Sequence, residues 1–142
     1  MSQFRQRTPA EDAALLVVLH DIHRRSRHRQ PLTIDALIDV WGRFVLQVEN
    51  GYKLSIYDYT NDLMVRDQLD EIIAGTPPTL SSDIQAILEP WDDRYRLATV
   101  ASTKPILPGP DVSTRRRWWR VPRNLSGELR DDLLSDGIIV AE

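Results

Sequence analysis

Residues 33–51 read TIDALIDVWGRFVLQVENG and decide the fold class of this chain. The apolar residues recur every three or four positions, which places them on one stripe of an α-helix. Thr33 is a favourable N-cap residue, and Asn50 followed by Gly51 is a typical helix stop. We therefore predict a helix over 33–50 with a buried stripe. The members of the stripe are Ile34, Leu37, Ile38, Trp41, Phe44, Val45 and Val48.

The opposite face of this predicted helix is charged. It carries Asp35, Asp39 and Arg43. Asp39 and Arg43 stand four residues apart, the spacing at which opposite charges pair on a helix surface. This face is therefore predicted to be exposed to water.

The segments before and after this helix also carry helix signals. Thr8 and Pro9 are predicted to begin a first helix that ends near Arg25. In residues 52–75, one unbroken helix would place carboxylates within an apolar stripe and remove them from water at a cost. A break at Thr60 or Asn61 would avoid this conflict, so we expect a new helix to begin there.

The carboxy-terminal half is predicted to mix helices with two short strands. A helix should open at residues 81–83, be interrupted at Pro90 and end near Ala101. An irregular loop covers 102–113, since it is rich in proline. Strands are expected at 118–121 and 138–140, on either side of a helix at 126–134.

Length and composition fit a single small domain. The chain has 142 residues, of which 42% are hydrophobic, enough for one core. The fold class is thus predicted to be mainly α: one helical domain over 1–142, a bundle of four to five helices with a minor carboxy-terminal two-stranded β element. Residues 1–7 are polar and expected to be disordered.

Composition also limits the possible chemistry. The absence of cysteine excludes disulfides, thiolate zinc sites and a cysteine nucleophile, and it suits a cytoplasmic location. The longest apolar run, 13–19, is too short to span a membrane. No phosphate-binding loop occurs in the sequence. No metal-ligand spacing occurs either, because His20 and His23 lack the surrounding ligands of a zinc motif. We therefore expect no cofactor, no bound metal and no membrane association.

Charge is distributed unevenly along the chain. Residues 31–112 have a net charge of -7, whereas residues 1–30 carry +3 and residues 113–142 carry +1. Such asymmetry bears on the choice of partner. An acidic central block favours a basic protein partner.

The arginine-rich segment that follows offers an alternative. Arg115, Arg116, Arg117, Trp118 and Arg120 combine cations with an indole that could stack on bases, which would indicate nucleic-acid binding. The same segment could instead be structural. In that case one tryptophan fills the core while Arg117 and Arg120 pair with the acidic block.

Residues 57–62 gather the best candidates for a partner-binding surface. Tyrosine is a frequent interface anchor, and acids complement a basic partner. The predicted contacts are Tyr57, Asp58, Tyr59 and Asp62, with supporting charge from Asp35 and Asp39.

Two other interpretations of residues 57–62 stay open. Asp58, Asn61 and Asp62 could form the oxygen-ligand set of a metal-dependent enzyme. Alternatively, the segment is a capped helix start followed by a surface ladder of Asp62, Arg66 and Asp70.

The composition of residues 52–75 resembles a known family. The sequence Ile56-Tyr57-Asp58-Tyr59, followed by Asn61 and Asp62, is similar to the acidic helical segment of the small immunity proteins that block bacterial nuclease toxins. The resemblance implies a helical fold and an exposed tyrosine pair among carboxylates. It further implies that this surface binds a basic toxin domain.

Overall fold

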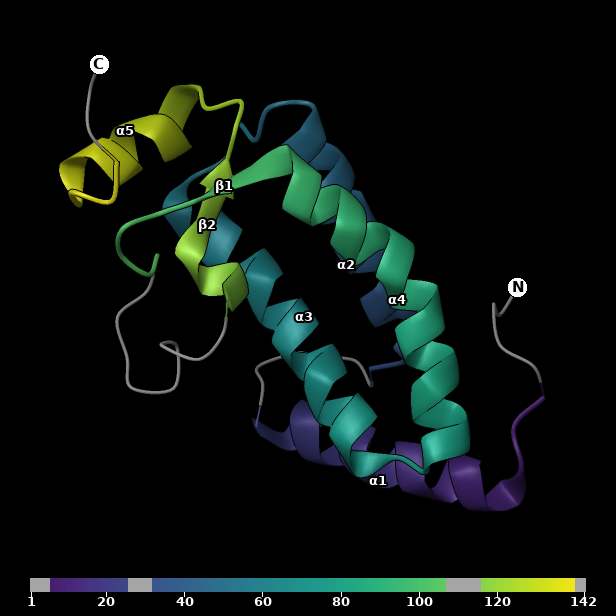
Figure 1. Cartoon of the computed structure of the whole chain (residues 1–142). Coiled ribbons are helices and arrows are strands. Elements are labelled where there is room, and N and C mark those ends of the chain that lie inside the picture. Colours follow the sequence, from purple (N-terminus) through teal and green to yellow (C-terminus); the bar gives the residue numbers. More distant parts are fainter. Residues whose placement is uncertain (1–5, 26–31, 107–115, 140–142) are drawn as a thin grey trace.

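The computed structural model describes residues 6–25, 32–106 and 116–139, and these residues form a mainly helical structure with a small sheet (Figure 1). The predicted fold class is confirmed. In chain order the elements are α1 (Pro9–Arg25), α2 (Ile34–Glu49), α3 (Ile56–Gly75), α4 (Pro78–Ala98), β1 (Thr99–Ala101), the 3-10 helix η2 (Arg116–Trp119), β2 (Arg120–Pro122) and α5 (Gly127–Ser135).

The helices are arranged around α3. In Figure 1, α3 and α4 run side by side from α1 at one end of the molecule toward the two strands and α5 at the other, and α2 lies behind them. The interhelical contacts of α2 are with α3 and α4, and those of α1 are mainly with α3. Helix α3, which contains the acidic residues 58 and 62, therefore lies at the centre of the fold.

The first two helices begin where the sequence predicts. The Thr8 amide donates to the Glu11 carboxylate over 2.9 Å, and the Glu11 amide donates to the Thr8 hydroxyl over 3.2 Å. These two bonds form a capping box, which satisfies amides that a helix start leaves unpaired. For α2, the Thr33 hydroxyl accepts from the Ala36 amide over 3.2 Å.

The stripe of α2 forms the centre of the core, as predicted. All of its members are buried, and Trp41 is completely enclosed. Five aromatic rings meet here, with centroids 5.2 to 6.0 Å apart. They belong to Trp41, Phe44, Tyr52, Tyr59 and Tyr95. Edge-to-face aromatic contacts of this kind add to the stabilisation from burial.

The predicted break at Thr60 or Asn61 is wrong, because α3 is continuous and begins earlier. Ser55 is its N-cap, and the Asp58 carboxylate accepts from the Ser55 amide in a capping box. The Asp58 side chain thus lies against the first turn of α3. The Asp62 carboxylate, one turn further on, accepts a hydrogen bond from the Tyr52 hydroxyl. The desolvation conflict that suggested a break is thus reduced by a capping bond within the first turn and by a longer-range bond from Tyr52.

Helix α4 also differs from the prediction. It begins at Pro78, a favoured residue at a first helical position, and passes through Pro90 without a break. Leu88 and Tyr95 on either side of Pro90 are buried against the core. Burial on both sides offsets the lost hydrogen bond at the proline.

The small sheet consists of a different pair of strands from the one predicted. Strand β2 pairs antiparallel with β1, so that Val121 lies opposite Val100. The sequence predicts the end of a helix at residues 99–101, where the structure has β1. Ile138 and Ile139 form no strand and instead fold back on α5, where the Ile138 amide donates to the Leu133 carbonyl over 2.9 Å. Val140, like most of residues 1–7 and of the loop 102–113, lies outside the described residues.

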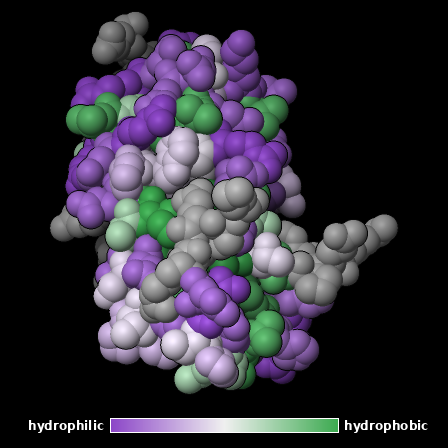
Figure 2. Space-filling model, turned by 90° about the vertical axis from the view of Figure 1, so that its right-hand side faces the viewer, coloured by the Kyte–Doolittle hydropathy of each residue, from purple (hydrophilic) through white to green (hydrophobic). Residues whose placement is uncertain are grey.

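The surface toward the viewer in Figure 2, the right-hand side of Figure 1, is covered mainly by hydrophilic side chains. Hydrophobic residues lie there in small groups, as on an ordinary water-facing surface. In the described part of the chain, no helix has the length and apolar character that crossing a membrane requires.

Candidate functional site

A groove of about 750 Å³ lies between α2 and α3, and we call it the α2–α3 groove. It brings together three residues that the sequence singled out, Tyr57, Asn61 and Asp62. The residues that line it are Arg25, Leu32, Ala36, Leu37, Val40, Tyr57, Asn61, Asp62, Met64, Val65 and Gln68. Most of them are apolar, as is usual for a binding groove.

The rim of the groove exposes large side chains to water. Tyr57 is 72% exposed and Met64 is 47% exposed. Val40 and Val65 are partly buried beside them. Exposed apolar and aromatic residues next to a concave surface are typical of protein contact sites.

The Asp62 carboxylate lines the groove and is held in one orientation. Its Oδ2 accepts a hydrogen bond of 2.8 Å from the Tyr52 hydroxyl. Its Oδ1 accepts no hydrogen bond from any described residue. Burial raises the pKa of Asp62 above its ordinary value, the Tyr52 hydrogen bond opposes this, and the nearby Asp58 charge adds to it. Asp62 is thus a partly desolvated carboxylate that has no cationic partner among the residues the structure describes.

This environment predicts a specific pH dependence of stability. Because the pKa of Asp62 is higher in the folded state than in the unfolded chain, the folded state binds more protons, and stability rises as the pH falls through that pKa. The wild type should therefore gain stability relative to the Asp62→Asn variant on acidification from pH 7. Paired denaturant melts measure the difference.

The melts need a matched control, which the surface of α5 provides. Asp131 is exposed there, so Asp131→Asn removes one surface carboxylate and reports the acid effects that all variants share. Acid effects shared by all variants cancel in these differences. A wild-type to Asp62→Asn difference that does not change with pH would contradict the proposed environment of Asp62.

Gln68 lies on the same groove one turn beyond Met64. Its side-chain oxygen Oε1 is buried and has no hydrogen-bond partner among the described residues. A buried, unpaired amide oxygen costs roughly 1 to 3 kcal/mol. Such a group is unusual in a folded protein and calls for an explanation.

Arg25 lines the groove at the end of α1 but is already paired. Its guanidinium donates to Asp21 on its own helix and to Glu71 on α3. The pKa of Arg25 is raised mainly by the hydrogen bond with Glu71. Arg25 therefore does not neutralise Asp62.

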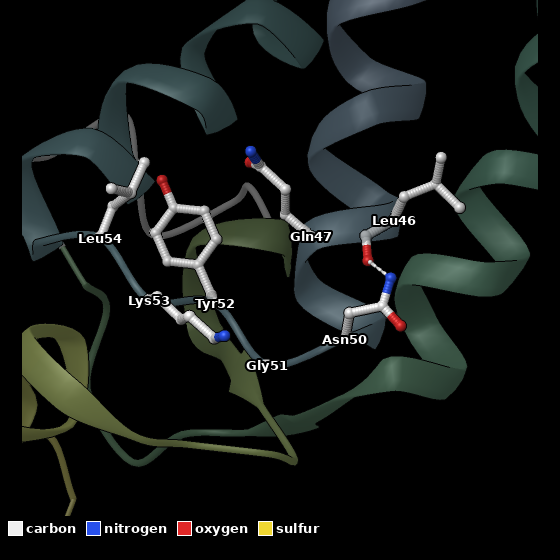
Figure 3. A pocket seen from close by; sticks show the side chains of 7 residues that line it. All are labelled: Leu46, Gln47, Asn50, Gly51, Tyr52, Lys53 and Leu54. Carbon is white, nitrogen blue, oxygen red and sulfur yellow. Dashed lines mark hydrogen bonds between the residues drawn. The ribbon is translucent and has the colours of Figure 1, made fainter.

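A second, smaller pocket of about 360 Å³ adjoins the connection between α2 and α3 (Figure 3). In Figure 3, the Asn50 side chain donates to the Leu46 carbonyl over 2.9 Å and closes the end of α2. Gly51 follows with a φ of +91°, which favours glycine. Tyr52 lines this pocket and also holds Asp62, so it links the two concave surfaces.

The predicted role of Tyr59 as a partner contact is wrong. The ring is completely buried, and its hydroxyl lies 3.1 Å from that of Tyr95 and donates to the Arg120 carbonyl over 3.3 Å. Burial raises the pKa of Tyr59 well above its ordinary value. Of the expected exposed tyrosine pair, only Tyr57 lies at the surface.

The predicted acidic residues occupy different environments. Asp35 and Asp39 are exposed on α2, and Asp39 pairs with Arg43 as the spacing predicted. Asp58 is partly buried and is engaged with the Ser55 hydroxyl over 2.7 Å. Asp35 and Asp39 therefore lie at the surface of α2, whereas Asp58 caps its own helix.

The metal-dependent alternative has little geometric support. It requires Asp58, Asn61 and Asp62 to converge, but Asp58 is turned to Ser55 and Asp62 to Tyr52. Within residues 6–25, 32–106 and 116–139, no group of three or more acidic or histidine side chains could hold a metal ion. The expected ladder of Asp62, Arg66 and Asp70 forms only in part: Arg66 pairs with Asp70 but is buried, and Asp62 accepts from Tyr52 instead.

Three of the five residues proposed for nucleic-acid binding serve the fold instead. Trp118 is buried, and its indole N–H donates to Asp67 over 2.9 Å. Arg117 pairs with Asp67 and with Asp70 on α3. Arg120 donates to the Thr99 hydroxyl over 2.7 Å and to backbone carbonyls.

The other two predicted nucleic-acid contacts are Arg115 and Arg116. Arg115 and the side chain of Arg116 lie outside the described residues. The expected pairing with the acidic block holds for Arg117, whereas Arg120 binds mainly backbone atoms.

Met64 and Gln68 line the groove but are not among the residues predicted from the sequence. They follow Tyr57 and Asn61 at helical spacing and form one line along α3, in which Gln68 is partly buried and the other three are exposed. The expected break at Thr60 or Asn61 interrupted this line. A continuous helix would have revealed it from spacing alone.

The chain matches no protein-family model, no curated protein and no solved structure. Its function therefore has to be inferred from the contacts and charges of its own residues.

Proposed function

We propose that this chain is a protein-binding module that receives a basic segment of another protein in the α2–α3 groove. The observation that carries the proposal is the coincidence of exposed Tyr57 and Met64 with the unneutralised carboxylate of Asp62 in one groove. Aromatic and flexible apolar side chains supply contact area, and a carboxylate supplies selectivity for cations.

The charge of the surrounding helices supports a basic partner. Residues 34–75 contain eight acidic and three basic side chains, a net charge of -5. Five of these acids are paired with arginines: Asp39 with Arg43, Glu49 with Arg94, Asp67 with Arg117, Asp70 with Arg66 and Arg117, and Glu71 with Arg25. The remaining negative field is weaker than the net charge of the range, but it still favours encounter with a positively charged protein and weakens as salt is added.

The proposal predicts that truncating the groove rim weakens partner binding without unfolding the protein. Tyr57→Ala and Met64→Ala should each reduce affinity, with Tyr57→Ala costing about 2 kcal/mol, or roughly 30-fold in Kd. A partner recovered from the native host by affinity purification is produced separately. Its Kd for each variant is then measured by calorimetry, together with the melting curve of each variant.

Leu97→Ala provides a matched control. Leu97 is 75% exposed on α4, so its truncation also removes exposed apolar surface, but away from the groove. It should leave the Kd unchanged. Equal affinities for wild type, Tyr57→Ala and Met64→Ala would exclude the groove as the binding site.

An inhibitor of the immunity type is the particular form of this function that we propose on the sequence resemblance. In that case the recovered partner is a basic toxin domain, and an equimolar amount of this chain abolishes its activity. The acidic character of residues 34–75 supports this form of the proposal, although one of the two expected tyrosines is buried. A partner with no activity to inhibit would leave only the general binding function.

A further inference from the structure

We infer that the α2–α3 groove contains a recognition site for an arginine side chain, whose guanidinium binds the free oxygen of Asp62. The inference rests on the proposed function and specifies which side chain of the basic partner is recognised. Asp62 is the only carboxylate among the residues that line the groove in the described part of the chain.

Asp62 is oriented before any partner binds. The Tyr52 hydroxyl donates to Oδ2 over 2.8 Å, and no donor from residues 6–25, 32–106 or 116–139 binds Oδ1. Tyr52 is itself fixed, because its ring is buried against Phe44 and Tyr59. A carboxylate held in this way loses little freedom when a ligand binds, which favours affinity.

The walls of the groove suit the rest of an arginine side chain. Val40, Met64 and Val65 offer apolar surface to its methylene groups. The exposed ring of Tyr57 lines the same groove and provides an aromatic face for the guanidinium plane. A guanidinium is planar and more weakly hydrated than an ammonium group, so it enters a partly apolar groove at lower cost.

Gln68 takes no part in binding the guanidinium. Its Oε1 is buried and has no partner among the described residues, so a donor of the partner segment cannot reach it. It also lies six residues along α3 from Asp62, about 9 Å at the rise of an α-helix. The unpaired oxygen is therefore a cost to the fold and not a part of the arginine site.

The test uses two small probes of nearly equal shape, N-acetylarginine methylamide and N-acetylcitrulline methylamide. Citrulline replaces the guanidinium by a neutral urea group. Backbone amide shifts of the 15N-labelled full chain are followed as each probe is added. The arginine probe should cause saturable shifts in residues 36–40 and 57–68, and the citrulline probe should bind at least about fivefold more weakly.

Variants identify the group that recognises the charge. Asp62→Asn should weaken binding of the arginine probe about tenfold. Asp131→Asn removes the same charge from the surface of α5 and should change binding less than twofold. Gln68→Met should leave binding of this small probe unchanged and raise the melting temperature, because it removes an unpaired buried oxygen.

Several results would overturn the inference. These are equal affinity for arginine and citrulline probes, unchanged affinity in Asp62→Asn, or shifts centred outside the groove. Equally tight binding of N-acetyllysine methylamide would overturn the choice of arginine. Saturable shifts of the same residues with magnesium chloride would assign the site to a metal ion instead.

The two proposals can fail separately. If the partner's affinity depends on Tyr57 and Met64 but the arginine probe does not bind at Asp62, the groove binds protein without an arginine site. If the probe binds as expected but the partner's affinity is unchanged in Tyr57→Ala and Met64→Ala, the proposed protein-binding role of the groove is wrong.

Discussion

Replacing Arg66 by alanine should destabilise the protein by about 2 to 4 kcal/mol, somewhat less than the cost of breaking a fully buried ion pair, because the side chain of Asp92 is 32% exposed. Arg66 donates to both oxygens of Asp92 on α4, over 3.0 and 2.8 Å, and to Asp70 on its own helix over 2.6 Å. Only 8% of its side chain is exposed. Its loss would leave the Asp92 carboxylate without a cation between α3 and α4.

Arg43→Ala is the matched control for this experiment. Arg43 also pairs with an aspartate four residues away, Asp39, but the two side chains are 71% and 57% exposed. An exposed pair of this kind contributes at most about 0.5 kcal/mol. Urea unfolding of both variants measures the difference. Similar losses for Arg43→Ala and Arg66→Ala would contradict the importance of the buried network.

Trp41→Ala should cost about 3 to 5 kcal/mol, because it opens a cavity in the centre of the core. Trp41 is completely buried against Phe44 and Tyr95. Its indole N–H donates to Asp92 over 3.0 Å, so the change also weakens the network around Arg66. Denaturant melts followed by circular dichroism measure the loss.

Two further variants separate the contributions at Trp41. Trp41→Phe keeps much of the apolar volume but removes the donor to Asp92, so it should cost less than Trp41→Ala. Leu97→Ala truncates an exposed side chain on α4 and should change stability by less than about 0.5 kcal/mol. A loss below about 1 kcal/mol for Trp41→Ala would mean that the core does not depend on this residue.

The binding predictions require that the groove variants fold normally. Tyr57 and Met64 are exposed, so their truncation removes little buried area. Asp62→Asn removes a charge that burial disfavours and keeps an oxygen that can accept from Tyr52. A loss of binding in these variants would therefore report on recognition and not on unfolding.

Local sequence determined the helices whose signals agree with one another. In α2, the Thr33 cap, the apolar stripe through Trp41 and the stop at Gly51 all indicate the same helix, because capping and helical periodicity depend on neighbouring residues. The start of α1 at Thr8 and Pro9 follows for the same reason.

Where local signals conflicted, contacts with residues outside the segment determined whether the helix continued. The carboxylates at 58 and 62 argued for a break in α3, but Asp62 finds a donor in Tyr52, ten residues earlier in the chain. Pro90 argued for a break in α4, but buried residues on both sides keep the helix continuous. Neither outcome can be derived from the local segment, because its free energy includes contacts with other elements.

For the candidate site, too, some properties follow from the sequence and others only from the tertiary structure. The sequence by itself determined that this chain carries an acidic helical centre with tyrosines at 57 and 59, because charge and residue type are fixed by composition. Only the tertiary structure decided that Tyr59 is buried, that Tyr57 is exposed and that Asp62 faces a groove with one oxygen to which no described residue donates. Exposure and desolvation depend on how α2 packs against α3, and residue spacing along one helix does not contain that information.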